Sequence, residues 1–197
     1  MKFLGEDDEI IIQGDQGKVT EEVVSVVRGA LKDSRVKYLE FPLNKDFATF
    51  KNNAFKHCSK DYIYLIDPDE IPHPKMLEYV KALIIENPEI EVYRIPRVNL
   101  VIGLTPEYSK SQGWNVQRIK VPKLDYDTKE ILAIYGIKER DAKKGELEIE
   151  VVNFPDHQMR LMKNHRGIRY ENRVHEVLKG FKIQTFLPFQ LSDPFSE

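Results

Sequence analysis

The sequence predicts an α/β protein built on a mostly parallel sheet that helices flank. Three observations lead to this fold class. Apolar segments of strand length alternate with amphipathic segments of helix length through the first hundred residues, which is the pattern of β-α-β units. Hydrophobic residues make up 41% of the chain, which is enough to build a core. The length of 197 residues favours one compact unit, because a domain holds about 150 residues.

Strands and helices are expected to alternate through the first half. Short runs of β-branched and aromatic residues predict the strands, and apolar residues that recur at helical spacing predict the helices. Thr20 suits the N-cap of the first helix, and Pro74 suits the first turn of the third. The predicted strands are Glu9–Gln13, Val36–Phe41, Tyr62–Ile66 and Glu91–Pro96, and the predicted helices are Thr20–Leu31, Asp46–Cys58 and Pro74–Ile85.

The β-α alternation stops after about Arg97, and the second half is expected to form a β-rich lobe. Lys143, Lys144 and Gly145 favour a hairpin turn, although a solvated loop explains them equally well. Asn164 and Gly167 favour a second turn between two late strands. The expected strands of this lobe are Ile131–Ile137, Leu147–Val152, Gln158–Met162 and Ile168–Val174.

Composition excludes several classes of protein. The formal net charge of −2 leaves no global basic field of the kind that binds nucleic acid or anionic lipid. The only cysteine, Cys58, cannot form an internal disulfide, which favours a reducing compartment. No apolar run approaches the ~20 residues of a spanning helix, and the N-terminus has no signal pattern. The cytoplasm is therefore the expected compartment, with no membrane span.

The segment Asp61–Glu70, DYIYLIDPDE, is a predicted strand that ends in three carboxylates. In a parallel sheet the carboxyl ends of the strands form the ligand crevice. In an extended continuation Asp67 and Asp69 would point to the same side and share one hard cation, Mg²⁺ or Mn²⁺. A solvated acidic turn shaped by Pro68 also explains this triplet when it is taken alone.

Two longer segments contain motifs that can be compared with known families. Phe47–Glu70, FATFKNNAFKHCSKDYIYLIDPDE, is similar to the "FAxARNxAL" helix and "GDYIxFLDADE" strand of family-two glycosyltransferases, which have the GT-A fold. Asn153–Glu176, NFPDHQMRLMKNHRGIRYENRVHE, is similar to "YPDYQIRLFRNxxGIRFEGRVHE" in one branch of it. The resemblance extends over roughly Glu9–Val101 and Asn153–Val177 and leaves the middle of the chain unmatched.

The resemblance implies a GT-A, Rossmann-like sheet flanked by helices, with a β-rich C-terminal acceptor lobe. Residues 1–102 would bind nucleotide-sugar and metal, and residues 103–197 would form the acceptor side. The implied reaction is inverting, metal-dependent transfer of a sugar from a nucleoside-diphosphate donor to an acceptor hydroxyl. The implied roles are metal binding by Asp67, Asp69 and His175 with Mn²⁺ or Mg²⁺, general-base catalysis by Asp156, and donor or phosphate binding by Asp15, Lys51, Asn52, Asp67 and Arg173.

The chain departs from the family pattern at its start. The match begins at the family's second strand, so the usual first strand-helix unit is expected to be lacking. The loop Gln13–Lys18 also differs from the family's "DxGSTDGT", which displaces the acidic residue to Asp15. An open strand edge left by a missing strand would favour a homodimer.

Several alternatives stay open at this point. Asp156 would also fit an Asx-type turn, His175 an edge position packed on Tyr170, and Lys51 or Arg173 a surface salt bridge. The competing function is a non-catalytic GT-A-like subunit that binds a sugar or a partner. The acceptor is a glycan, a lipid, a protein or modified nucleic acid, and the basic residues Lys110, Arg118, Lys120 and Lys123 are the support for the last.

Overall fold

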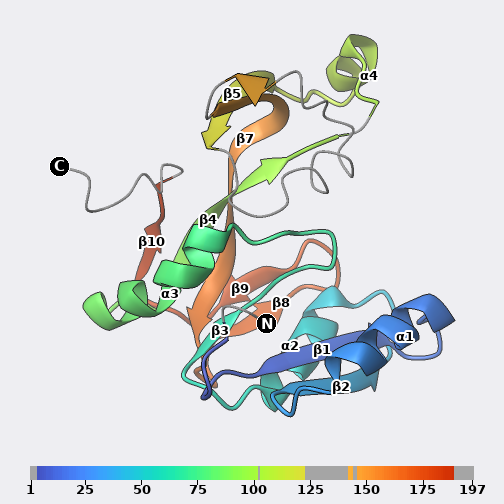
Figure 1. The fold of residues 1–197 in the computed structure, drawn as a ribbon, viewed down its shortest axis with the longest axis vertical. Helices are drawn as coiled ribbons and strands as arrows, with labels where there is room; N and C mark the ends of the chain where they lie inside the picture. Colours follow the sequence, from blue (N-terminus) through green and yellow to red (C-terminus); the bar gives the residue numbers. More distant parts are fainter. Residues whose placement is uncertain (1–3, 102, 123–141, 144–145, 189–197) are drawn as a thin grey trace. The chain divides into compact units, whose positions relative to one another are not determined.

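The structure is a computed structural model that describes residues 4–101, 103–122, 142–143 and 146–188 (Figure 1). The chain divides into two compact units. The first comprises residues 1–65, 87–93 and 159–185, and the second comprises residues 66–86, 94–158 and 186–197. Each unit thus combines segments that are distant in sequence. The assignment of donor and acceptor functions to residues 1–102 and 103–197 stays a prediction.

The first unit begins with a β-α-β element. Strands β1 (Ile10–Asp15) and β2 (Val36–Phe41) pair in parallel, from Ile10 opposite Val36 to Asp15 opposite Phe41. Helix α1 (Glu21–Ala30) connects them and buries Val27. Thr20 holds the predicted N-cap position, but its side chain accepts no capping hydrogen bond. The parallel pair and its connecting helix confirm the β-α-β interpretation for this part of the chain.

Helix α2 (Phe47–His57) packs against β1 and β8 in the same unit. Its N-cap is Asp46, whose carboxylate accepts a hydrogen bond from the backbone N–H of Thr49 at 2.9 Å. Gln13 on β1 donates to the backbone oxygen of Phe50 at 2.7 Å and accepts from the Asn53 side chain at 2.8 Å. Polar contacts as well as apolar packing therefore set the position of α2 on this sheet.

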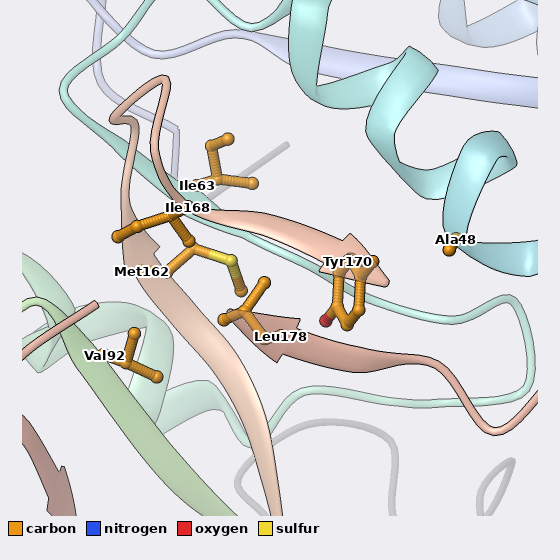
Figure 2. Packing of buried hydrophobic residues seen from close by; sticks show 7 residues of the cluster. All are labelled: Ala48, Ile63, Val92, Met162, Ile168, Tyr170 and Leu178. Atoms are coloured by element: carbon orange, nitrogen blue, oxygen red, sulfur yellow. The ribbon is translucent and has the colours of Figure 1, made fainter. Parts of the chain in front are cut away.

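The core of the first unit lies where β3 (Tyr62–Tyr64) pairs antiparallel with the end of β7 (Glu146–Lys163). The hairpin of β8 (Arg169–Glu171) and β9 (Val177–Lys179) contributes further apolar side chains. Figure 2 shows Met162, Ile168 and Leu178 meeting at its centre. The buried cluster comprises Ala48, Ile63, Val92, Met162, Ile168, Tyr170 and Leu178.

Close backbone packing at this hairpin requires a glycine. Gly180 has φ +88°, and a Cβ at this position would lie 1.7 Å from the backbone oxygen of Gly167. An L side chain would therefore clash as well as adopt an unfavourable backbone conformation.

The second unit contains helices α3 (Pro74–Glu86) and α4 (Pro106–Ser111) and an antiparallel ladder. Strands β5 (Val116–Pro122) and β6 (Ala142–Lys143) both pair antiparallel with β7, and Val151 and Val152 are buried. Strand β4 (Val92–Asn99) runs through both units, as β7 does, and β10 is Gln184–Phe186. The strand order is β10-β4-β7-β3.

The prediction of a mostly parallel sheet is wrong for this larger sheet. Strand β7 runs antiparallel to β3, β5 and β6, so the protein has mixed sheets. The alternation of strands and helices predicts only the relative direction of strands that follow each other in the chain. Strands that come together from distant parts of the chain need not be parallel. The α/β class itself is correct.

Most predicted elements are confirmed within a few residues. Val36–Phe41 is confirmed at both ends. The predicted strands Leu147–Val152 and Gln158–Met162 are parts of the one strand β7, and the expected strand Ile168–Val174 is shortened to Arg169–Glu171. Lys143 pairs with Glu146, as a hairpin there requires, whereas Ile131–Ile137 lies outside the described residues. None of the helices in the described part has the length and apolar character to cross a membrane.

Candidate functional site

Carboxylates of the second unit gather at a turn that follows β3. The backbone N–H of Glu70 donates to the backbone oxygen of Asp67 at 3.0 Å, and the N–H of Asp67 donates to the Glu70 carboxylate at 3.2 Å. Pro68 and Asp69 occupy the centre of this turn, as Pro favours the second position of a turn. Asp67 is half-buried and Asp69 is exposed.

The expectation of an extended continuation is therefore wrong. Strand β3 ends at Tyr64 rather than Ile66, and Asp67 and Asp69 belong to a turn, where spacing by two does not put side chains on one side. The fixed φ of Pro68 accounts for the reversal. The backbone of this segment is therefore a turn, as the alternative explanation expected. The turn does not by itself test whether Asp67 and Asp69 bind a metal.

Arg97 on β4 connects this turn to Asp156 on β7. Its Nη1 donates to the Glu70 carboxylate at 3.2 Å, while Nε and Nη2 donate to Asp156 Oδ2 at 3.1 and 2.6 Å. The Glu70 and Asp156 side chains are only 17% and 23% exposed. A single guanidinium thus bonds carboxylates from two separate segments of the second unit.

Asp156 lies within β7 and does not open an Asx-type turn. Besides Arg97, Asn99 donates to its Oδ2 at 3.0 Å and Gln158 donates to its Oδ1 at 2.6 Å. Burial acts to raise the pKa of Asp156, but the hydrogen bonds from Asn99, Arg97 and Gln158 and the charge of Arg97 outweigh it, so the pKa is lowered. The carboxylate is held ionised, with protein donors at both oxygens.

The donor set of the acidic turn suits a hard cation. Carboxylate oxygens are the ligands that Mg²⁺ and Mn²⁺ prefer, and one or two of them suffice when substrate phosphates complete the coordination. Asp67, Asp69, Glu70 and Asp156 share this unit with the Arg97 guanidinium, which leaves an excess of negative charge. Among the described residues no three His, Cys, Asp or Glu side chains are gathered as a metal-binding group. The metal-binding role of Asp67 and Asp69 therefore stays a prediction.

Asp15 stands at the end of β1 in the first unit. Its carboxylate accepts from the backbone N–H of Leu43 at 2.9 Å and lies 3.0 Å from the Lys18 ammonium. The Leu43 hydrogen bond is the main cause that lowers the pKa of Asp15, followed by that of Lys18. Asp15 thereby supports the loop that carries Asn44 and Lys45, both with positive φ.

Lys51 and Asn52 lie on the face of α2 that contacts β8. Asn52 donates to the backbone oxygen of Tyr170 and accepts from its backbone N–H, both at 2.8 Å. The Lys51 ammonium lies 2.7 Å from Glu176 and 5.2 Å from the centre of the Tyr170 ring. The Lys51 and Glu176 side chains are 15% and 19% exposed, so this ion pair is largely shielded from solvent.

Arg173 and His175 lie in the segment between β8 and β9. The Arg173 side chain donates to the backbone oxygen of Asn44 at 3.3 Å and lies 3.7 Å from Asp46, yet it is 72% exposed. His175 is exposed and has φ 55°. The backbone oxygen of Arg173 accepts from the N–H of Phe47, at the start of α2. The first unit therefore brings Lys51, Asn52 and Arg173 together at α2, with Asp15 bonded to the adjoining loop.

Several residues of these sites were missed by sequence reasoning. Arg97 and Asn99 both bond Asp156, and their spacing by two on β4 is a period-two signal that points them to one face. Gln158 has the same relation to Asp156 on β7. Glu176 follows directly after His175, but nothing local to its sequence identifies Lys51 as its partner.

An α/β fold in which carboxylates follow a sheet strand, with a further carboxylate on a nearby strand, is typical of enzymes that act on phosphate-bearing substrates. The sequence model for glycosyl transferase family 2 matches residues 3–144, and the chain belongs to this family. The family noted from the sequence is thereby confirmed, but the expectation of an unmatched middle is wrong, because the match runs on to residue 144. The second segment, Asn153–Glu176, lies beyond the matched residues, and its resemblance stays a prediction. Membership gives the protein the GT-A α/β fold, glycosyltransferase activity and a nucleotide-sugar donor. No curated protein sequence matched the chain.

Replacing Asn52 with Ala should lower the free energy of unfolding by about 1–3 kcal/mol, because it removes two hydrogen bonds to the backbone of Tyr170. Chemical denaturation measures this loss. Lys56→Ala is the matched control, since Lys56 is an exposed residue on the same helix. Equal stability of the two variants would show that the Asn52 hydrogen bonds contribute nothing to folding.

Proposed function

We propose that the chain is an inverting, metal-dependent glycosyltransferase that moves a hexosyl group from a nucleoside-diphosphate donor to an acceptor hydroxyl. The acceptor oxygen forms a bond to the anomeric carbon as the carbon–oxygen bond to the diphosphate breaks. The hydroxyl proton passes to Asp156, and the electron pair leaves with the nucleoside diphosphate. A cation held by Asp67 and Asp69 would offset the charge that develops on the diphosphate.

The observation that carries this proposal, beside the family, is the hydrogen-bonded connection of the acidic turn to Asp156 through Arg97. It joins the two carboxylate groups that the reaction requires within one unit. Asp15, Lys51, Asn52 and Arg173 are proposed to contact the donor. For Lys51 this means exchanging Glu176 for a phosphate.

His175 is proposed as a further metal ligand, with Mn²⁺ or Mg²⁺ as the ion, on the sequence resemblance alone. The acceptor is left as a glycan, lipid, protein or modified nucleic acid. The cytoplasm remains the expected compartment on the cysteine argument.

A second candidate function is a non-catalytic GT-A-like subunit that binds a sugar or a protein partner. The observation that favours it is the lowered pKa of Asp156, which the hydrogen bonds from Asn99, Arg97 and Gln158 produce against the effect of burial. A general base works best when its pKa lies near the operating pH, so a carboxylate whose pKa is lowered is a weaker base.

A panel of nucleotide sugars with Mn²⁺, read by the release of nucleoside diphosphate, separates the two candidates. The enzyme should consume one donor, and chelation of the metal should stop the reaction. If every donor stays intact while the chain binds a glycan or protein tightly, the binding-subunit function holds instead.

Self-association is proposed through the sheet of β1 and β2, which has two strands in the described part of the chain. A strand edge is a template for pairing with another chain. Light scattering at high concentration should therefore give the mass of a dimer, and a strict monomer would reject this part of the proposal.

Asp67→Asn should abolish Mn²⁺-dependent binding of a nucleoside diphosphate in calorimetry. The free energy of unfolding should change by no more than about 0.5 kcal/mol, because the change relieves repulsion among neighbouring carboxylates. Asp61→Asn removes an exposed carboxylate a few residues earlier and is the control. Unchanged metal-dependent binding in the Asp67 variant would reject the metal site.

Asp156→Asn should lower kcat by about 10²–10⁴-fold and leave donor affinity unchanged, because a base acts mainly in the transition state. Glu150→Gln is the control, since Glu150 is a 56%-exposed carboxylate on the same strand. A collapse of donor affinity with normal turnover of the bound complex would make Asp156 a binding residue.

A further inference from the structure

Arg97 differs from Arg118, another ion-pairing arginine of the second unit, in the surroundings of its contacts. The pair Arg118–Glu150 on β5 and β7 has side chains 74% and 56% exposed, as is usual for a surface salt bridge of little energetic value. The carboxylates that Arg97 bonds are 17% and 23% exposed, and Arg97 itself is 38% exposed. Its charge is thus partly desolvated, and the loss of either partner leaves a poorly solvated charge.

The two carboxylates bonded by Arg97 also accept other hydrogen bonds. Glu70 accepts the backbone N–H of Asp67 through Oε2 while its Oε1 accepts from Arg97, so one carboxylate closes the acidic turn and contacts the guanidinium. Asp156 receives Nε and Nη2 of the same guanidinium on Oδ2. Because the guanidinium is planar and rigid, the direction of these bonds fixes where each carboxylate lies.

We infer that Arg97 is a positioning residue, which holds the Asp156 carboxylate in a fixed place relative to the turn Asp67–Glu70. The inference rests on the proposed function, in which Asp156 acts as the base and the turn binds the metal and diphosphate. In the proposed reaction Arg97 neither takes the proton nor holds the metal, and it acts through the Asp156 and Glu70 carboxylates that it bonds. It sets the distance between the turn and Asp156.

The polar and charged groups around Asp156 determine how a substitution changes its pKa. Arg97 and Asn99 reach it from β4, Gln158 reaches it from β7, and Glu70 faces it across Arg97. His157, the next residue on β7, bonds the backbone oxygen of Leu187 instead. Of these groups only Arg97 supplies a positive charge in direct contact, so its removal should raise the pKa of Asp156.

The test compares the full-length protein with Arg97→Gln, Arg97→Lys and the control Arg118→Gln by carbon NMR of the Asp carboxyl groups. The Asp156 signal is identified by its loss in Asp156→Asn. Its titration should move to higher pH in Arg97→Gln and by less in Arg97→Lys, which keeps the charge but not the planar fork. Arg118→Gln should leave it unchanged.

A second readout examines the connection between the two groups. The backbone amide signal of Asp67 should shift in Arg97→Gln, because that amide donates to the Glu70 carboxylate, which accepts from Arg97. In a folded Arg97→Gln variant, unchanged Asp156 titration or an unmoved Asp67 amide would overturn the inference. If that variant does not fold, Arg97→Lys applies the same two criteria.

Steady-state kinetics give a third readout. Arg97→Gln should lower kcat by about 10²-fold, as a misplacement on the order of 1 Å does, and leave the KM of the donor unchanged. A raised KM with normal kcat would make Arg97 a donor-binding residue and overturn the positioning role. An inactive wild-type protein would reject the proposed function alone, since both NMR readouts remain measurable.

Discussion

Backbone pairing along β7 is the constraint on which the arrangement inside each unit depends. Its buried N–H and C=O groups must find partners, and they find them in β3 near its end and in β5 and β6 near its beginning. Leu161 and Met162 are adjacent and both at most 2% exposed, so that part of β7 is covered on both faces. Since side chains alternate along a strand, the register that buries these residues also orients Asp156 and Gln158 together.

The hydrogen bonds to Asp156 fix the orientation of its carboxylate and also reduce its basicity. Donors from Arg97, Asn99 and Gln158 hold the carboxylate in place, and the same hydrogen bonds overcome the effect of burial and lower its pKa. A base that is held this firmly gains in orientation and loses in affinity for the proton. In the proposed role of Asp156 as the base, these two effects act against each other.

In the first unit, helix α2 carries the polar residues Lys51 and Asn52. Both functional atoms of the Asn52 side chain bond the Tyr170 backbone, which fixes the helix against β8 with directional contacts. The segment after β8 contains Asn172 and His175 with positive φ, and Lys51 pairs with Glu176 at its end. Asn and His adopt the left-handed region more readily than most residues. A tight, irregular segment is thus held beside a regular helix.

The sequence by itself determined the α/β class, most element positions, the acidic cluster and the family, because these depend on local periodicity and on contiguous motifs. Strand Val36–Phe41 and the helix predicted over Asp46–Cys58, which is observed as Phe47–His57, follow from neighbouring residues alone. Only the tertiary structure decided the direction of β7 against its neighbours and the partners of Asp156. Arg97 lies 59 positions from Asp156 and Lys51 lies 125 from Glu176, and such pairs arise from strand order and register, which no local pattern encodes.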